Sequence, residues 1–162
     1  SALLHDPAMA DLVARRGVPV VLMHMKGDPK TMQVSPSYAD CPAEVRAFLL
    51  EAALRAQCAG VDRRMVILDP GIGFGKRLED NLALIARLGE LAAEGYPVLV
   101  GLSRKAFVGA VTGRAVEDRL SGSLGAACAA FLGGARIFRA HDPAQTADAL
   151  AVFSAALAGG EA

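Results

Sequence analysis

The chain alternates short apolar runs with longer segments in which apolar side chains recur every three or four positions. Each short run is almost continuously apolar and is bounded by glycine, proline or polar residues. This pattern is typical of strands in a parallel sheet that is covered on both faces. It predicts four strands, which cover Val18–Met25, Met65–Asp69, Pro97–Gly101 and Ala135–Arg139.

The longer segments have the spacing of amphipathic helices. One begins with Pro42, which suits a first helical turn, and stops at Gly60. Its apolar stripe is formed by Val45, Phe48, Leu49, Ala52 and Ala53. A later segment repeats the pattern through Leu120, Leu124, Cys128 and Phe131. The predicted helices cover Pro7–Arg16, Pro42–Ala59, Glu79–Glu94, Asp118–Leu132 and Pro143–Leu157.

This alternation predicts an α/β fold with parallel strands joined by right-handed crossovers. Two architectures fit the pattern, a doubly wound open sheet and part of an eightfold barrel. A complete barrel usually has about 250 residues. The 162 residues are enough for one domain and, in a barrel, would supply roughly half of the βα units.

Polar side chains follow each predicted strand at its carboxyl end. The clusters are His24 to Gly27, Asp69 with the glycines after it, Ser103 to Lys105, and Arg139 to Asp142. The carboxyl ends of parallel strands meet on one face, where α/β enzymes of both architectures have their active sites. The clusters therefore predict one functional site.

The stretch DPGIGFGK, from Asp69 to Lys76, looks like a phosphate-binding loop but has the wrong spacing. Counted from Gly71, the P-loop and the dinucleotide fingerprint both need a glycine where Lys76 stands. The glycines instead predict a turn with positive φ angles. For Asp69 two interpretations stay open, a turn or helix cap and an acceptor for the paired N–H donors of a planar heterocycle.

The last two clusters add cations to the same face. Lys105 can act as a point donor over the cavity that Asp69 borders. Arg139 and His141 lie two positions apart, so an extended backbone puts both on one side, where they can hold a phosphate. Asp142 is interpreted as the cap of the helix that starts at Pro143. Ser103 is not expected to be a nucleophile, because no G-x-S-x-G elbow surrounds it.

The composition of the chain limits the kinds of binding partner that are expected. The formal net charge is zero and aromatic residues make up 5% of the chain, so nucleic acid is not an expected partner. No apolar run is long enough to cross a membrane. The three cysteines have neither metal-ligand nor disulfide spacing, and Cys58 and Cys128 are expected to be small buried residues. A cytoplasmic location fits this usage. No pair of histidines has metal-ligand spacing, so no metal site is expected within the chain.

Five blocks together resemble the dihydropteroate synthase family. They are LMHMKGDPKTMQ from Leu22, LDPGIGFGK from Leu68, GLSRKAFVG from Gly101, RLSGSL from Arg119 and RAHD from Arg139. The blocks occur in the family's order, and the resemblance covers residues 1–162. It implies a (β/α)8 barrel of the TIM type, of which this chain would be the C-terminal part with four βα units.

The resemblance implies a transferase of folate biosynthesis that condenses 6-hydroxymethyl-7,8-dihydropterin diphosphate with 4-aminobenzoate. Sulfonamides compete with the aminobenzoate in this family. The family pattern assigns the pterin to Asp69, Lys105, Met23, Gly101 and Arg139, with Lys105 and Arg139 also catalytic. It assigns the diphosphate to Arg139 and His141. Phe74 and Ser103 would border the aminobenzoate.

The resemblance also implies what this chain lacks. The first barrel strands, and the asparagine expected to hold Mg²⁺, would lie upstream of Ser1. A barrel strand without neighbours exposes unpaired backbone groups, so the 162 residues alone are expected to be unstable or inactive. A homodimer through the late barrel helices is also implied. Two alternatives remain, a pterin-binding methyltransferase and a fragment without activity.

Overall fold

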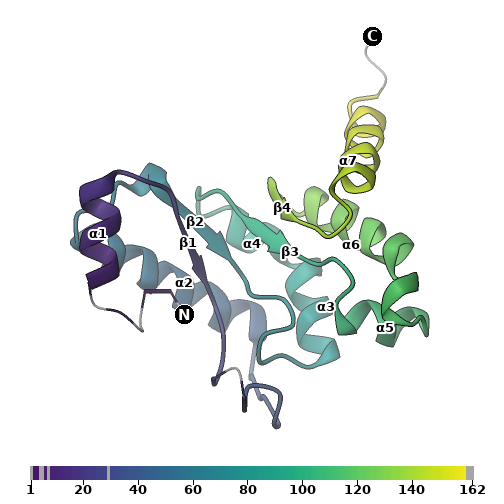
Figure 1. Ribbon diagram of the computed structural model, residues 1–162, viewed down its shortest axis with the longest axis horizontal. Coiled ribbons are helices and arrows are strands. Elements are labelled where there is room, and N and C mark those ends of the chain that lie inside the picture. The colour runs from purple at the N-terminus through teal and green to yellow at the C-terminus, as the bar shows by residue number, and fades with distance from the viewer. Residues whose placement is uncertain (1, 4–5, 7, 29, 160–162) are drawn as a thin grey trace.

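A computed structural model describes residues 2–3, 6, 8–28 and 30–159. Its strands are all parallel. β1 (Val20–Met23) pairs with β2 (Val66–Asp69), and β3 (Leu99–Gly101) pairs with β4 (Ile137–Arg139). A single bridge between Leu68 and Val98 joins the two pairs. The strands therefore stand side by side in chain order, as in an arc of a barrel wall (Figure 1).

The helices lie between the strands along the chain. α2 and α3 lie behind the strands in the view of Figure 1, while α1 and α7 lie at opposite ends of the molecule. The helices are α1 (Ala8–Arg16), α2 (Cys41–Cys58), α3 (Leu78–Ala86), α4 (Leu88–Ala92), α5 (Ala106–Thr112), α6 (Leu120–Leu132) and α7 (Pro143–Leu157). Short 3₁₀ helices cover Arg63–Met65 and Val116–Asp118. Among the described residues, no helix is long and apolar enough to cross a membrane.

Most predicted elements are confirmed, with shorter strands. The prediction of one continuous helix over Glu79–Glu94 is wrong, because the segment forms two helices, α3 and α4. They are separated at Arg87, whose φ of −106° lies outside the helical range. The short helix α5 was not predicted, and it ends at Gly113 with a φ of +70°. The prediction that the first helix starts at Pro7 concerns a residue outside the described ones.

The core lies between the strands and the helices behind them. The stripe predicted for α2 is confirmed, since Val45, Leu49, Ala52 and Ala53 are buried and Phe48 is half-buried. These side chains pack with Leu22, Val66, Leu68, Val98 and Val100 of the sheet region. The opposite face of the strands is more open, and Val21 is 42% exposed. The prediction that both faces are covered is therefore wrong at Val21 of β1.

The buried face predicted for α6 is wrong. Leu120, Leu124, Cys128 and Phe131 are only half-buried, and the buried positions are Ser123, Ala127 and Ala130. Small residues let α6 approach α5 closely, since a Cβ on Gly122 would lie 2.5 Å from Cγ1 of Val108. Cys58 is exposed at the end of α2, so its predicted burial is wrong too.

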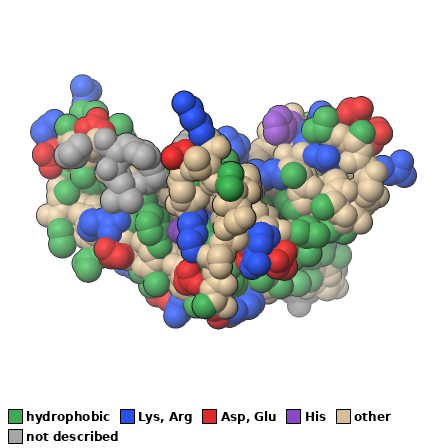
Figure 2. Space-filling view, turned by 90° about the horizontal axis from the view of Figure 1, so that it is seen from below, with side chains coloured by type: hydrophobic (Ala, Val, Ile, Leu, Met, Phe, Trp, Pro, Cys, Tyr) green, Lys and Arg blue, Asp and Glu red, His purple; other side chains and the backbone are tan. Residues whose placement is uncertain are grey.

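The surface carries both signs of charge. In the face that Figure 2 shows, Lys and Arg side chains are interspersed with Asp and Glu side chains rather than gathered in one basic patch. This distribution agrees with the formal net charge of zero.

Candidate active site

The strand register places four of the predicted site residues on one face. Met23 pairs with Asp69, and Gly101 pairs with Arg139, each at the carboxyl end of its strand. Side chains alternate along a strand, and the residues just before these, such as Leu22 and Leu68, are buried on the helix side. The four site residues therefore lie on the face that the helices leave open.

Asp69 is the buried carboxylate of this face. Its side chain is 8% exposed, and its Oδ1 accepts the N–H of Gly71 at 2.8 Å. Burial raises the pKa of Asp69, and the Gly71 bond and the charges of Lys105 and Arg139 oppose that rise. The turn-cap interpretation is thus confirmed for one oxygen. A carboxylate has four acceptor positions, so this contact leaves capacity for the donors of a ligand.

Lys105 brings a cation close to this carboxylate. Its Nζ donates to the carbonyl of Ile72 and lies 4.4 Å from the ring centroid of Phe74. Burial lowers the pKa of Lys105 to about 8, with Asp69 raising it and Arg139 lowering it further. A Cβ on Gly73 would lie 3.2 Å from Cδ of Lys105, so the glycine leaves room for the lysine stem.

A cavity of about 120 Å³ lies beside Lys105, and two neighbouring strands supply its walls. It is lined by Gly101, Ser103, Lys105, Arg139, Ala140 and His141. Nδ1 of His141 lies 3.1 Å from the hydroxyl oxygen of Ser103, which also accepts the backbone N–H of His141 at 3.2 Å. Two cations, an imidazole and a hydroxyl in one small cavity are suited to an anionic group.

The glycine of β3 gives Arg139 its place in this cavity. A Cβ on Gly101 would lie 3.4 Å from both Nε and Nη2 of Arg139. The guanidinium therefore rests against the backbone of the neighbouring strand, where a side chain would crowd it. This contact explains why a glycine at the end of an otherwise apolar strand can belong to the site.

Not every predicted residue reaches the same cavity. Met23 lines a separate hollow of about 310 Å³ with residues of the first helix and strand, among them Met9, Val20 and Val21. Phe74 touches the site through Lys105 and is half-buried. The structure thus brings Ser103, Lys105, Arg139 and His141 together, with Asp69 and Phe74 next to Lys105 and Met23 beyond Asp69.

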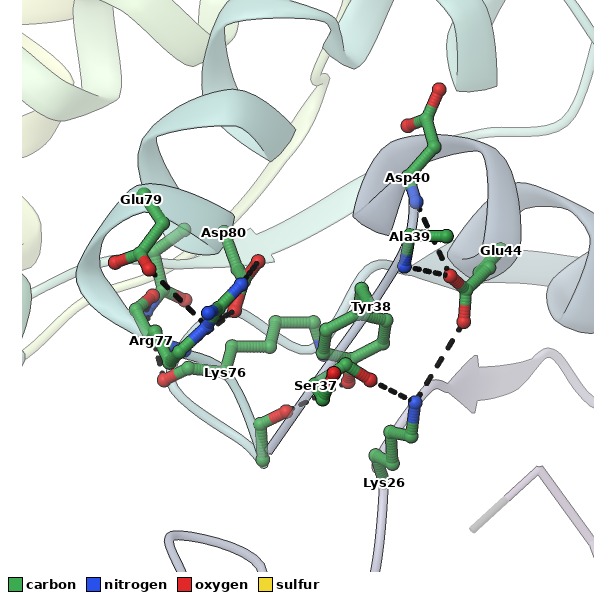
Figure 3. A network of polar contacts seen from close by, with 12 residues as sticks. Lys26, Ser37, Tyr38, Ala39, Asp40, Glu44, Lys76, Arg77, Glu79 and Asp80 are labelled. Atoms are coloured by element: carbon green, nitrogen blue, oxygen red, sulfur yellow. Dashed lines mark hydrogen bonds and ion pairs between the residues drawn. The ribbon is translucent and has the colours of Figure 1, made fainter. Parts of the chain in front are cut away.

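Lys76 closes the glycine loop from inside. Its side chain is buried, and Nζ lies 2.9 Å from Nδ1 of His24 while it donates to the carbonyls of Gly71 and Phe74. Figure 3 shows the lysine chain running inward toward Tyr38, whose hydroxyl donates to the carbonyl of Gly75. Since its donors are used within the fold, Lys76 is not placed to cradle a phosphate.

His24 is a buried, hydrogen-bonded core residue. Burial lowers its pKa to about 3, with a further contribution from the charge of Lys76, so the ring is neutral and can accept from the lysine. Burial likewise lowers the pKa of Lys76 to about 8. The pair links the end of β1 to the loop after β2, at a distance of 52 positions in sequence.

Asp142 does not cap the last helix with its side chain, so that prediction is wrong. It occupies the cap position of α7, but its carboxylate forms a double bridge with Arg104, at 2.7 Å and 3.0 Å. This ion pair lowers the pKa of Asp142. The sequence reasoning missed the pair, because its members are 38 positions apart and only the order of the strands brings them together.

The Mg²⁺ that the resemblance implies was sought among the described residues. Within residues 2–3, 6, 8–28 and 30–159, no three His, Cys, Asp or Glu side chains gather where they could hold a metal ion. The Mg²⁺ ion stays an expectation from the resemblance.

Known proteins resemble this chain over most of its length. A family model described as "Pterin binding enzyme" matches residues 1–141. The dihydropteroate synthase of Escherichia coli K12 is 44% identical over 158 residues, which are 98% of this chain and 56% of the relative. That of Neisseria meningitidis serogroup B is 45% identical over 159 residues, 95% of this chain and 56% of the relative.

Solved structures give the same result. The Xanthomonas albilineans dihydropteroate synthase with 4-aminobenzoic acid has a TM-score of 0.90 at 47% identity, covering 97% of this chain and 56% of that one. The Yersinia pestis enzyme in a sulfonamide complex has a TM-score of 0.92 at 39% identity, covering 96% and 57%. These likenesses confirm the partial TIM barrel over the open sheet. The chain spans about half the length of the relatives it matches.

Proposed function

Because this chain belongs to the family of pterin-binding enzymes, we propose that it carries the substrate-binding face of a dihydropteroate synthase. The proposed reaction condenses 6-hydroxymethyl-7,8-dihydropterin diphosphate with 4-aminobenzoate and yields 7,8-dihydropteroate and pyrophosphate. The observation that carries this proposal is the convergence of a buried carboxylate, Asp69, with the cationic cavity of Lys105, Arg139 and His141.

In the proposed mechanism, Asp69 accepts the paired N–H donors of the pterin's aminopyrimidine edge. Lys105 donates to the pterin ring. Arg139 and His141 hold the diphosphate. When the C–O bond breaks, its electrons leave with the diphosphate, and the negative charge develops next to the guanidinium of Arg139. The amine of 4-aminobenzoate then forms the C–N bond to the methylene carbon and loses one proton. This sequence needs neither a covalent enzyme intermediate nor a strong base.

Phe74 and Ser103 are proposed to border the aminobenzoate, and Met23 to wall the pterin. The contact of the Phe74 ring with Lys105 supports the first assignment, because it places an aromatic surface next to the pterin contact. The pairing of Met23 with Asp69 supports the second. A homodimer and a cytoplasmic location remain part of the proposal. Leu132, Val152 and Leu157 are exposed on α6 and α7, where a second subunit could cover them.

Calorimetric titration with a non-reacting pterin analogue, followed by an assay with both substrates, tests this function. We expect saturable binding of the analogue to the chain even where the 162 residues alone turn over no substrate. Pyrophosphate release that needs 4-aminobenzoate would identify the synthase. Methyl transfer from a methylated pterin to a corrinoid would instead identify the rival methyltransferase, and a chain that binds no pterin at all would contradict the proposal.

Anion binding is expected to depend on the charge of Lys105. Its pKa of about 8 means that the ammonium is charged below pH 8 and loses its proton as the pH rises through that value. Sulfate is a suitable probe because it does not titrate in this range. Its affinity should fall between pH 7 and pH 9.5, because Lys105 loses its positive charge over this range.

The variant Lys105→Met provides the comparison for this titration. It should bind sulfate more weakly at pH 7 and lose the fall above pH 8. Lys76 also has a pKa of about 8 but lies buried behind the glycine loop. An unchanged fall in Lys105→Met would therefore assign the pH dependence to another group and contradict the placement of Lys105.

A further inference from the structure

The turn that presents Ser103 and Lys105 has an unusual backbone. Arg104, between them, has a φ of +57°, in the left-handed region. A residue with a Cβ is strained there by roughly 1–2 kcal/mol, so such a conformation persists only where neighbouring contacts hold it. The side chains on either side of Arg104 both line the cationic cavity. Whatever holds this turn therefore also sets their directions.

Two residues at the start of α6 hold the turn. The hydroxyl oxygen of Ser123 accepts the N–H of Arg104 at 2.9 Å, and this hydroxyl donates to the carbonyl of Arg119 at 2.7 Å. Nη1 of Arg119 donates to the carbonyl of Arg104 at 3.1 Å and lies 3.5 Å from that of Lys105. Ser123 is 6% exposed. Both peptide groups around Arg104 are thus bonded to the RLSGSL block, to which the proposed chemistry gives no role.

A glycine on α5 makes room for this contact. A Cβ on Gly109 would lie 2.3 Å from Nη2 of Arg119 and 2.6 Å from its Cζ. Glycine in the middle of a helix costs roughly 0.5–1 kcal/mol relative to alanine. The close approach of the guanidinium gives a physical reason for glycine at this position. Arg119 itself is tied further by a bond from Nε to the carbonyl of Arg114.

The turn is also tied to the end of β4. The guanidinium of Arg104 bridges to Asp142, and the hydroxyl of Ser103 contacts His141. A shift of the turn would therefore move His141 as well as Lys105. Within the described residues, these contacts connect the start of α6 to the groups that line the cavity from both strands.

We propose that Arg119 and Ser123 are positioning residues, which fix the left-handed turn at Arg104 and so aim Lys105, Ser103 and His141 at the anionic group of the substrate. This inference rests on the proposed function for the identity of that group. Neither residue lines the cavity, so neither is assigned a contact with substrate.

Two pairs of matched variants test the proposal. Ser123→Ala removes the hydroxyl that holds Arg104, and Ser121→Ala removes an exposed hydroxyl from the same helix. Gly109→Ala displaces Arg119, and Gly125→Ala adds a methyl group in the middle of α6 where nothing lies within 4 Å. Both glycine changes favour helix formation, so Gly109→Ala should fold even where Ser123→Ala does not.

The main measurement is the dissociation constant for inorganic pyrophosphate at pH 7. Ser123→Ala and Gly109→Ala should each weaken binding roughly fivefold to twentyfold, as expected for one or two lost hydrogen bonds that orient the site. Ser121→Ala and Gly125→Ala should stay within about twofold of the original chain. Thermal melting, recorded in parallel, separates loss of the fold from loss of position.

A ligand-free measurement separates this proposal from the proposed function. The ¹⁵N signals of the Lys105 amide and the His141 ring should shift in Gly109→Ala but not in Gly125→Ala. If the original chain binds no pyrophosphate while these signals shift, the proposed function fails and the positioning stands. Unchanged signals and unchanged pyrophosphate affinity in Gly109→Ala would overturn the positioning role, even if the melting temperature fell.

Discussion

Replacement of Asp69 by asparagine is expected to weaken the binding of a pterin analogue by roughly 100-fold while the fold remains intact. The proposed ligand presents paired N–H donors, and a carboxylate accepts both. Asparagine keeps one acceptor oxygen but turns a donor toward the ligand. Hydrogen bonds to charged groups contribute roughly 1.5–3 kcal/mol each. Loss of one such bond, together with an amide N–H of asparagine facing an N–H of the ligand, accounts for a change of this size.

The fold should tolerate this change because of how Asp69 is bonded. The amide oxygen of asparagine can still accept the N–H of Gly71, which Asp69 accepts at 2.8 Å. The substitution also removes a charge whose burial raises the pKa of Asp69 above its ordinary value. The loss of a buried charge offsets part of the loss of attraction to Lys105 and Arg139. The melting temperature should therefore change little compared with the affinity.

The control is Asp62→Asn, just before the amino end of β2. Asp62 accepts the N–H of Arg64, two positions on, at 2.8 Å, just as Asp69 accepts that of Gly71. It lies before β2 rather than at the strand's carboxyl end. Titration of both variants with the analogue should show the large loss only for Asp69→Asn. Equal affinities of the two variants for the analogue would contradict the assignment of Asp69 to the pterin site.

The sequence predicts the site's backbone positions well, and the reason is physical. Apolar runs bounded by turn residues define the strands, and parallel strands present their carboxyl ends on one face. Asp69 and Arg139 end two of these runs, so their position on a common face could be predicted without coordinates. The cavity beside Lys105 follows from the same argument.

Side-chain partners could not be predicted in this way. The spacing around Lys76 already excluded a phosphate-binding loop, but the sequence did not reveal that Lys76 turns inward to His24, which it reaches because the glycines let the end of β1 approach the loop. Asp142 reads as a helix cap, but a guanidinium from another loop lies closer to its carboxylate. Both outcomes depend on which segments distant in sequence come to lie side by side, and single-sequence periodicity carries no such information.

The buried face of α6 shows a second limit of the pattern. Large apolar side chains usually mark the buried stripe of a helix, and Leu124 and Phe131 led to the wrong face. Where helices approach closely, small residues occupy the contact instead, as Ala127 and Ala130 do here. Ser123 is buried on this face because its hydroxyl is bonded to the turn at Arg104. The position of Ser123, a polar residue in a stripe of alanines, was the sequence signal that could have indicated its bond to this turn.

The largest effect on stability is expected for Gly71→Ala. Gly71 has a φ of +67°, and a Cβ there would lie 1.9 Å from the carbonyl oxygen of His24. That oxygen belongs to backbone, and the N–H of the same residue donates to the carbonyl of Asp69 at 3.0 Å. The end of β1 would have to move away from β2 to admit the methyl group. We expect a loss of more than about 3 kcal/mol in the free energy of unfolding, since strain and overpacking combine.

Gly17→Ala separates the two contributions to this loss. Gly17 follows α1 with a φ of +61°, and a Cβ there would meet nothing within 4 Å. This variant should therefore show the backbone strain alone, roughly 1 kcal/mol. Urea unfolding of both variants gives the comparison. A loss in Gly71→Ala no greater than that in Gly17→Ala would mean that the loop yields easily. The glycine would then be required for its φ angle and not for the close contact between the end of β1 and the loop that carries Asp69.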